Sequence, residues 1–501
     1  MSLSPIAPQE RTSTGISGLD DILGGGWPTG HLYLVEGEPG AGKTTLGLQF
    51  LLDGAARGDR CLYITLSETR EELITVADSH GWDLAGIDIF ELIDTNGLKP
   101  DAEQSILHPS ELELGETIRD VMVEIERLQP RRVVFDSLSE MRLLAQDALR
   151  YRRQILALKQ FLRRFDCTTL LLDDKTSGSN DLQLHSLAHG VLTLMQTTGE
   201  YGDERRTLRV AKLRGARFRG GTHDFNLGTG GLRVFPRLVA AEHRHDQRHE
   251  VMPTGTAKLD LLLGGGLYYG TNTLFVGPSG VGKTTTALSC VFAALERGEK
   301  ATYYLFDEGL PTLVSRCTAL GIPLQPYLDS GQLEIHPLDP AEVSPGQFAM
   351  NVRDAVERRG ARVIGIDSLN AYLQSMPGSR FLLLQMHELL TYLNQRGVAT
   401  ILILSQHGVL GEGRIDVDLS YLSDALLMFR YFEARGSLLR ALSVVKSRAS
   451  SHEFTIREFR LGAQGIEVGP ALSDFEGVLG GITTYRGSGS LLGDDTRIVE
   501  A

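Results

Sequence analysis

The chain has 501 residues, more than one hydrophobic core usually holds, which predicts two large domains. With 42% hydrophobic and 23% charged residues, its composition is that of an ordinary water-soluble globular protein. Fifty basic and 63 acidic residues give a net charge of −13, which argues against a surface that coats DNA or RNA. We therefore do not expect a nucleic-acid partner.

The cysteines and the apolar runs of the chain indicate its compartment. The four cysteines lie mostly in apolar runs, without the C-x-x-C spacing of metal or redox sites: Cys61, Cys167, Cys290 and Cys317. The first 15 residues lack the pattern of a signal peptide, and no apolar run has the length needed to cross a bilayer. We expect a cytoplasmic protein with buried, reduced thiols and no membrane contact.

The chain repeats itself. The segment STGISGLDDILGGGWPTG (13–30) matches PTGTAKLDLLLGGGLYYG (253–270) at an offset of 240 residues. Further along, RRVVFDSLSEMRLL (131–144) matches ARVIGIDSLNAYLQ (361–374). The same parts in the same order indicate a duplicated domain.

We place the first domain at residues 1–245 and the second at 246–501. The charged stretch 239–250 contains several histidines, which could bind a metal, but a solvated linker is the simpler interpretation because no metal-site motif accompanies them. The Gly- and Ser-rich tail from about residue 478 is expected to be extended or mobile, that is, flexible.

Within each half, apolar strand-like runs alternate with helical patterns. This alternation predicts an α/β domain with a mainly parallel, twisted sheet flanked by helices, and ligands at the carboxyl ends of the strands. In the first half a long amphipathic helix is expected at 149–165, and strands are expected at 32–36, 61–65, 87–92, 131–136 and 168–173.

Each half contains one phosphate-loop motif, G-x-x-x-x-G-K-[ST], between an expected strand and an expected helix. In such a loop backbone N–H groups wrap a polyphosphate, the lysine reaches the outer phosphates and the hydroxyl ligates Mg²⁺. The residues expected to hold ATP are Gly37, Gly40, Ala41, Gly42, Lys43, Thr44 and Thr45 in the first half and Gly277, Gly280, Val281, Gly282, Lys283, Thr284 and Thr285 in the second.

Hydrolysis also needs a carboxylate near Mg²⁺. Asp136 and Asp367 each end an apolar strand, and we expect them to serve the metal together with Thr44 and Thr284. The alternative is an acid that caps a helix, which the following serine would serve equally well. Recurrence of Asp-Ser in both halves favours the metal role.

The order of these motifs resembles the KaiC family of RecA-like ATPases. The resemblance rests on TG…LD…LGGG, the phosphate loop, a strand followed by acids and then GWDL (81–84), the Asp-Ser pair and K-L-R-G, and it extends to DFEGVLGGITTYRG (474–487). It implies two tandem RecA-like domains that bind ATP and Mg²⁺ and assemble into a double ring of six subunits.

In that family two adjacent glutamates follow the strand next to the phosphate loop, and the first is the catalytic base. This chain has Ser67 and Glu68 in the first half, and Asp307 and Glu308 in the second. Neighbouring residues of an extended strand face opposite ways, so Glu68 would need a local shift to act. We expect catalytic roles for Glu68, Asp307 and Glu308, a first site that mainly holds ATP, and a second that carries most of the phosphoryl chemistry.

Two further sets of residues follow from the resemblance. The pairs Lys212/Arg214 and Lys446/Arg448 stand at the K-x-R positions that reach the ATP of the neighbouring subunit. In the second domain the family phosphorylates adjacent Ser and Thr residues. The candidates here are Ser420, Tyr421 and Ser423, so the Ser/Thr pair itself is not kept. The alternative for the serines is hydrogen bonding at the entry to a strand.

The leading hypothesis is a KaiC-like, ATP-hydrolysing homo-hexamer with serine autophosphorylation in its second domain, which switches conformation for a small regulatory protein partner. One alternative is a nearly inactive, ATP-gated scaffold, which the altered first carboxylates favour. Another is a RecA-type DNA-dependent ATPase, which the acidic balance disfavours.

Overall fold

The computed structural model describes most of the chain as two compact units, residues 1–237 and 238–501. The expected boundary after residue 245 thus lies a little beyond the observed division, and residues 244–249 of the expected linker lie outside the described residues. The described residues are 10–92, 109–145, 148–175, 182–198, 202, 204–243, 250–374, 379–406, 420–434, 436–463, 465–478 and 484–486.

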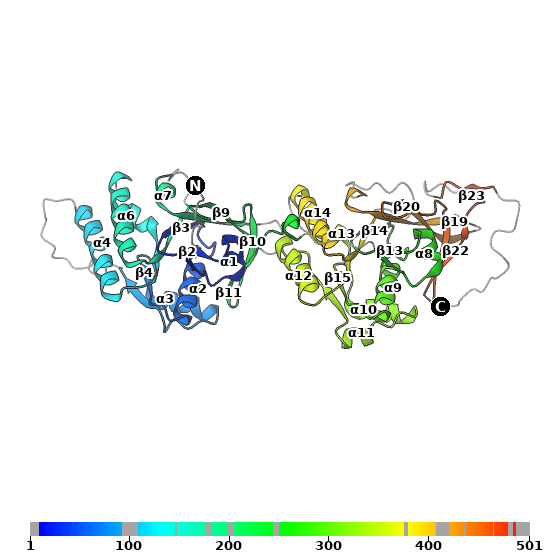
Figure 1. Ribbon diagram of the computed structural model, residues 1–501, viewed down its shortest axis with the longest axis horizontal. Helices are drawn as coiled ribbons and strands as arrows, with labels where there is room; N and C mark the ends of the chain where they lie inside the picture. Colours follow the sequence, from blue (N-terminus) through cyan, green and yellow to red (C-terminus); the bar gives the residue numbers. More distant parts are fainter. Residues whose placement is uncertain are drawn as a thin grey trace, which may run out of the picture. The chain divides into compact units, whose positions relative to one another are not determined.

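The first unit is built on a nine-stranded sheet with the strand order β11-β10-β9-β8-β3-β7-β6-β4-β5. Figure 1 draws this unit in blue to green. The strands from β8 to β5 in this order are parallel, and β9, β10 and β11 extend the sheet in antiparallel fashion. The bounds are β3 (Leu32–Gly37), β4 (Cys61–Thr65), β5 (Asp88–Glu91), β6 (Arg132–Asp136), β7 (Thr168–Asp174), β8 (Gly190–Thr197), β9 (Arg205–Leu213), β10 (His223–Gly228) and β11 (Gly231–Phe235).

Helices cover both faces of this sheet and bury two separate apolar clusters. One cluster involves α1, α2 and α3, and the other involves α4, α5 and α6. The remaining bounds are β1 (Arg11–Thr12), β2 (Trp27–Pro28), α1 (Ser17–Leu23), α2 (Lys43–Ala56), α3 (Arg70–Ser79), α4 (Pro109–Leu128), α5 (Leu138–Ala145), α6 (Ala148–Leu162), η2 (Arg163–Phe165) and α7 (Leu182–Leu187).

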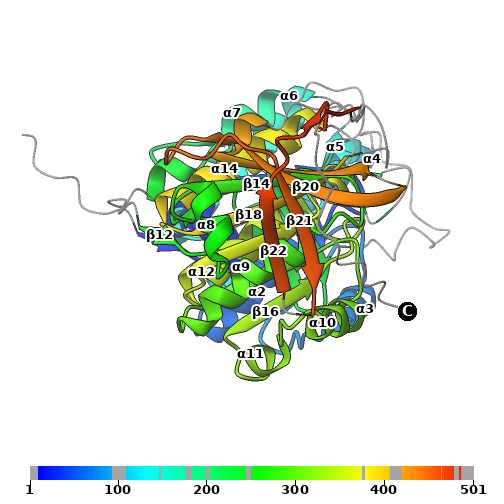
Figure 2. The ribbon, with the colours of Figure 1, turned by 90° about the vertical axis from the view of Figure 1, so that its right-hand side faces the viewer.

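The second unit repeats this architecture, with the strand order β16-β15-β17-β18-β14-β19-β20-β21-β22. In Figure 2 its antiparallel strands β20, β21 and β22 are the orange and red strands. Its strands are β12 (Val251–Met252), β13 (Leu267–Tyr268), β14 (Asn272–Gly277), β15 (Ala301–Leu305), β16 (Leu333–Pro337), β17 (Val363–Asp367), β18 (Ala399–Ser405), β19 (Ala425–Ala434), β20 (Ser437–Ser447), β21 (Arg457–Gly462), β22 (Gly465–Ala471), β23 (Phe475–Glu476) and β24 (Thr484–Tyr485).

Three apolar clusters lie among the described residues of this unit: one against α9, one against α14, and a small one around Phe432 of β19. Its helices are η3 (Ala240–His243), α8 (Ala257–Leu263), α9 (Lys283–Glu296), α10 (Leu310–Ala319), α11 (Gln325–Asp329), α12 (Pro345–Glu357), α13 (Leu369–Gln374), α14 (Ser379–Gln395) and η4 (Ser420–Leu422). Two tandem α/β domains with mainly parallel sheets are therefore confirmed.

The antiparallel strands are the part of each sheet that the alternation of strands and helices did not predict. β8 to β11 follow one another without an intervening helix, so they leave no βαβ signal. All four cysteines are free and buried, as expected. Over the described ranges, no helix combines the length and the apolar character needed to cross a bilayer.

The repeated TG…LD segment is a structural clasp at the start of each domain. The carboxylate of Asp20 accepts hydrogen bonds from the backbone N–H of Thr14 and the hydroxyl of Ser13, and Asp260 does the same for the N–H and hydroxyl of Thr254. The motif therefore holds the entering chain against its first helix.

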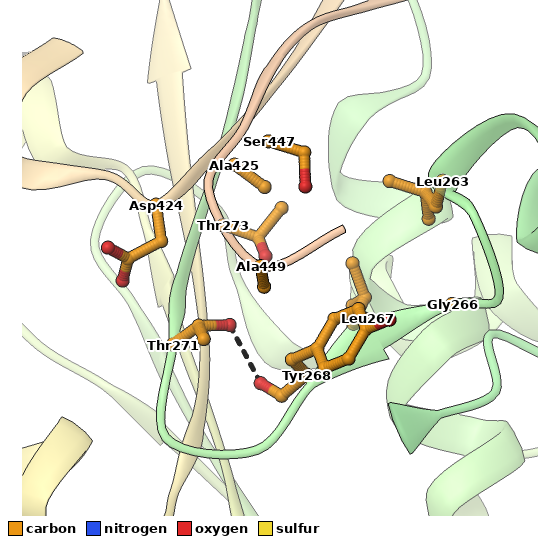
Figure 3. Close-up of a pocket in the computed structure, with 10 residues that line it drawn as sticks. All are labelled: Leu263, Gly266, Leu267, Tyr268, Thr271, Thr273, Asp424, Ala425, Ser447 and Ala449. Atoms are coloured by element: carbon orange, nitrogen blue, oxygen red, sulfur yellow. Dashed lines mark hydrogen bonds between the residues drawn. The ribbon is translucent and has the colours of Figure 1, made fainter. Parts of the chain in front are cut away.

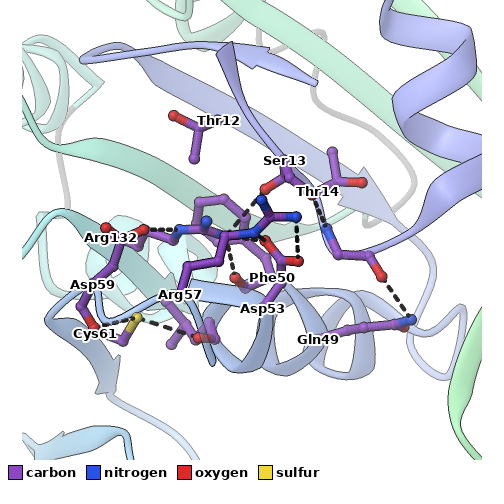
Figure 4. A network of polar contacts seen from close by, with 12 residues as sticks. Thr12, Ser13, Thr14, Gln49, Phe50, Asp53, Arg57, Asp59, Cys61 and Arg132 are labelled. Carbon is purple, nitrogen blue, oxygen red and sulfur yellow. Dashed lines mark hydrogen bonds and ion pairs between the residues drawn. The ribbon is translucent and has the colours of Figure 1, made fainter. Parts of the chain in front are cut away.

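A buried arginine ties this segment of the first domain to the sheet (Figure 4). The side chain of Arg132, on β6, is 3% exposed and pairs with Asp53 at 3.0 Å and Asp59 at 2.9 Å. It also donates to the carbonyl oxygens of Phe50 and Ser13. Because these partners come from α2, the loop after it and the entering chain, one guanidinium joins three segments.

Replacing Arg132 by alanine should destabilise the first domain by about 3 kcal/mol, because two carboxylates lose a buried partner. By differential scanning calorimetry of the nucleotide-free protein, the transition of that domain should shift down by roughly 6 °C or more. The matched control is Arg131→Ala, since the side chain of Arg131 is 56% exposed and its ion pair with Asp166 is 3.7 Å long. Equal shifts for both variants would contradict this role.

Candidate functional site

Each phosphate loop joins a central parallel strand to the helix behind it. β3 leads into the first loop and α2 leaves it, and β14 and α9 do the same in the second. In the first phosphate loop the backbone turns at Gly40 and Gly42, with positive φ angles of 81° and 94°. Residues that carry a Cβ rarely adopt such angles. The loops therefore present backbone N–H groups and a helix N-terminus at the carboxyl edge of the sheet.

The lysine of each loop is folded back onto the loop itself. The Nζ of Lys43 donates to the carbonyl oxygens of Gly37 and Glu38, at 3.1 and 2.9 Å. The Nζ of Lys283 donates to those of Gly277 and Pro278, at 2.8 and 2.7 Å. Both side chains are buried, and burial lowers the pKa of Lys283 to about 8.

A threonine, an aspartate and a tyrosine meet behind the first loop. The hydroxyl of Thr44 donates to Oδ2 of Asp136 at 3.1 Å, and the hydroxyl of Tyr63 donates to the same oxygen at 2.6 Å. Asp136 ends β6 and is 6% exposed. Burial raises the pKa of Asp136, against the effect of these two hydrogen bonds.

The second domain repeats the arrangement. Thr284 and Tyr303 donate to Oδ2 of Asp367, at 2.7 and 2.9 Å, and burial raises the pKa of this carboxyl too. A hydroxyl and a carboxylate together at the end of a phosphate loop are oxygen ligands of the kind that Mg²⁺ takes. The residues at both sites thus fit ATP with Mg²⁺.

Glu68 lies in the turn after β4, which ends at Thr65. The hydroxyl of Thr65 accepts from the backbone N–H of Glu68 and donates to its carbonyl oxygen. The strict alternation of an extended strand therefore does not apply, and Glu68 turns inward while Ser67 is exposed. Its Oε2 is buried and has no hydrogen-bond partner among the described residues.

Burial is the main cause that raises the pKa of Glu68 to about 7, followed by the negative charges of Asp136, Glu72 and Asp174. A carboxyl with such a pKa can exchange a proton near neutral pH. The charge of Lys43 acts in the opposite direction and lowers the pKa of Glu68, so this carboxyl feels both the phosphate-loop lysine and Asp136.

The equivalent acids of the second domain have protein partners. Asp307 is exposed and accepts a hydrogen bond from the hydroxyl of Ser368, next to Asp367. Glu308 forms an ion pair with Arg316 of α10 at 2.9 Å. In place of Thr65 this strand ends in Leu305, so the clamp that sets Glu68 has no counterpart.

The K-x-R pairs lie at the opposite edge of each sheet from the phosphate loop. In the first domain Lys212 is paired with Val191, and Val191 with Leu34 near the start of β3, whereas the loop follows the end of that strand. The Nζ of Lys212 donates to the carbonyl oxygens of His185 and Ala188.

Arg214, the second member of this pair, follows the end of β9 and lies at the same edge. Its guanidinium donates to the carbonyl oxygen of Ser186 in α7 at 2.9 Å, and its backbone N–H donates to that of His189 at 3.0 Å. Within one copy of the chain, Lys212 and Arg214 thus contact the segment around α7 rather than their own phosphate loop.

The second pair has the same position. Lys446 is opposite Leu426, near the start of β19, and donates to the carbonyl oxygen of Ser423 at 2.6 Å. Arg448 pairs with Asp424 at 3.7 Å. A small cavity opens beside this pair, lined by Thr271, Asp424 and Ser447 among others (Figure 3). Since it lies at the amino ends of β14 and β19, it is separate from the phosphate loop.

The three phosphorylation candidates differ in exposure. Ser420 begins η4, and its side chain is not among those described. Tyr421 is 48% exposed, whereas Ser423 is fully buried.

Four further residues belong to the two sites although no sequence motif indicated them: Thr65, Tyr63, Tyr303 and Asp174. The two tyrosines stand at the same offset of 240 residues as the phosphate loops, so the repeat itself carried the signal for them. Asp174 contacts Lys43 only through the pairing of β7 with β3, and no local pattern shows that contact.

Comparison with known proteins identifies the family of the chain. The profile of the family described as ATPase: KaiC matches residues 12–239 and 252–473, one copy for each domain. The chain is 27% identical to the circadian clock oscillator protein KaiC of Acaryochloris marina, over 94% of this chain and 91% of that protein.

The corresponding protein of Synechococcus elongatus is 26% identical, over 95% of this chain and 92% of its own. The circadian clock protein KaiC3 of Synechocystis is 24% identical, over 95% of both chains. With two family matches that together span most of the sequence, the chain belongs to the KaiC family of ATPases.

Proposed function

We propose that both phosphate loops bind ATP with Mg²⁺ and that the chain hydrolyses it. The observation that carries this proposal is the threonine–aspartate–tyrosine arrangement behind each loop, which recurs with the same partner atoms in both domains. Membership of the KaiC ATPase family supports it.

The residues divide the work as follows. Lys43 and Lys283 leave their backbone acceptors to hold the outer phosphates. Thr44 with Asp136, and Thr284 with Asp367, hold Mg²⁺, which neutralises charge on the phosphates when it is bound. The tyrosine hydroxyls hold Oδ2 of the two aspartates in place, and these carboxylates would take part in holding Mg²⁺.

In the first domain Glu68 is the base that takes a proton from the attacking water, because its buried oxygen has no other partner among the described residues. In the second domain the carboxylate next to Asp367 is Asp307, reached through Ser368. This assignment gives the first site a larger share of hydrolysis than Ser67 alone suggests.

The K-x-R pairs act on a neighbouring copy of the chain. Each lies at the amino edge of its own sheet; its lysine is level with Leu34 or Leu274, about three residues of strand, or roughly 10 Å, before the phosphate loop begins. In a ring, that edge meets the loop of the next copy, and the cations stabilise charge on the transferring phosphoryl group. A hexamer, as the KaiC resemblance implies, is the assembly proposed.

ATP turnover in such a ring drives a switch in signalling or timing, with a small regulatory protein as partner. The relatives' names as clock proteins support this role. Ser420, at the start of η4, is the proposed site of autophosphorylation, with Tyr421 as the exposed neighbour.

A second candidate function is an ATP-gated scaffold with little turnover. The ion pair between Glu308 and Arg316 favours the scaffold, because an arginine then neutralises an acid proposed to act near the nucleotide. The amount of ADP formed over hours decides between the ATPase and the scaffold, because a scaffold would form little ADP. The RecA-type DNA-dependent ATPase has less support, given the net charge of −13.

Lys43→Ala and Lys283→Ala should each remove one of two nucleotide sites, because the lysine provides the main positive charge at its loop. By calorimetric titration with the non-hydrolysable analogue AMP-PNP and Mg²⁺, the stoichiometry should fall from about two per chain to about one, and to zero in the double variant. Lys300→Ala, at an exposed lysine, is the control. If both single variants bind and hydrolyse like the parent, the proposal fails.

Glu68→Gln, made in the Lys283→Ala background, should lower ATP turnover at the first site about 100-fold, since the amide cannot accept the proton. In the Lys283→Ala chain that keeps Glu68, kcat/KM for ATP hydrolysis should fall as the pH drops below about 7, because this base acts only when it is deprotonated. The control is Glu71→Gln, at an exposed carboxylate of α3. Unchanged turnover in Glu68→Gln, or a flat pH profile between 6 and 8, would exclude this base.

A further inference from the structure

The two phosphate-loop lysines differ in one contact. An ammonium group has three donors, and Lys43 uses two of them on loop carbonyls and the third on Oδ1 of Asp174, at 2.7 Å. The side chain of Lys43 is 8% exposed and that of Asp174 is 32% exposed, so the lysine is buried and its carboxylate partner lies closer to solvent. A carboxylate thus holds the atom that a phosphate must reach.

The second site has no such acid. Asp174 ends β7 opposite Gly37, and the residue in the same register position of the second sheet, opposite Gly277, is Ser405. The backbone of Ser405 is bound by the side-chain amide of Asn370. Within the described part of the chain, Lys283 forms no ion pair and keeps one donor free of a protein acceptor.

The charges around the two lysines differ accordingly. Near Lys43 lie the carboxyls of Asp136, Glu68 and Asp174, whose charges act on one another. At the second site Arg316 pairs with Glu308 and offsets its charge. A γ-phosphate that enters the first site therefore meets an additional negative charge beside the lysine, which the second site lacks.

We infer that Asp174 is a specificity-determining residue: it takes the place of the γ-phosphate on Lys43 and makes the first site discriminate against nucleoside triphosphate relative to diphosphate. The second site, with Ser405, does not discriminate in this way. The inference rests on the proposed binding of ATP at both loops. It predicts that the two sites of one chain hold different nucleotides at the same ratio of ATP to ADP.

The test exchanges the two residues in backgrounds that keep one site each. Asp174→Ser in the Lys283→Ala chain should bind AMP-PNP about tenfold more tightly than its parent, and ADP about twofold more tightly at most. Ser405→Asp in the Lys43→Ala chain should weaken AMP-PNP binding about tenfold. Both are measured by calorimetric titration with Mg²⁺. Asp174→Asn, which keeps the shape and removes the charge, should follow Asp174→Ser and serves if the serine variant does not fold.

The ratio of the two affinities is the decisive quantity, because a merely structural role for Asp174 would change both nucleotides alike. An unchanged ratio in both Asp174 variants, with normal binding in the parents, overturns this inference alone. Absence of AMP-PNP binding in the two single-site parents overturns the proposed function and this inference with it.

Discussion

The interaction on which both sites depend is the hydrogen bond between the phosphate-loop threonine and a buried strand-end aspartate. It joins the N-terminus of α2 to the end of β6, and that of α9 to the end of β17. Because Asp136 and Asp367 are buried, each would be costly without partners, and a tyrosine from the adjacent strand supplies a second donor. Two strands and one helix of each domain are thereby held together around the place where Mg²⁺ would bind.

The threonine–aspartate–tyrosine arrangement is the same in both domains, whereas the residues around it differ. In the second domain Leu305 replaces Thr65 and Ser405 takes the place of Asp174. Glu308 keeps the glutamate of Glu68 but is ion-paired with Arg316. The first site therefore has a candidate base and an acid on its lysine. The second has neither in that form, so the chemical surroundings of the two phosphate-loop lysines differ.

Much of this could be read from the sequence, because the informative signals are local and occur twice. The phosphate loops, Asp136 and Asp367 sit at strand ends that periodicity locates, and the parallel core follows from alternating elements. The contact between Asp174 and Lys43 could not be predicted, since it depends on which strand lies beside β3. The inward turn of Glu68 could not be predicted either. Alternation of side chains applies only within the strand, and β4 ends at Thr65, whose hydroxyl then fixes the turn that contains Glu68.

The central claim is that each phosphate loop is completed by the K-x-R pair of another copy, and mixing two inactive variants tests it most directly. One variant carries Lys43→Ala and Lys283→Ala, and the other has alanine at all four K-x-R positions. Alone, each should show little ATP turnover; mixed under assembly conditions, they should regain a substantial part of it, because intact loops then lie beside intact pairs. Turnover no greater than the sum of the two separate variants, or parental turnover in the second variant alone, would contradict the claim.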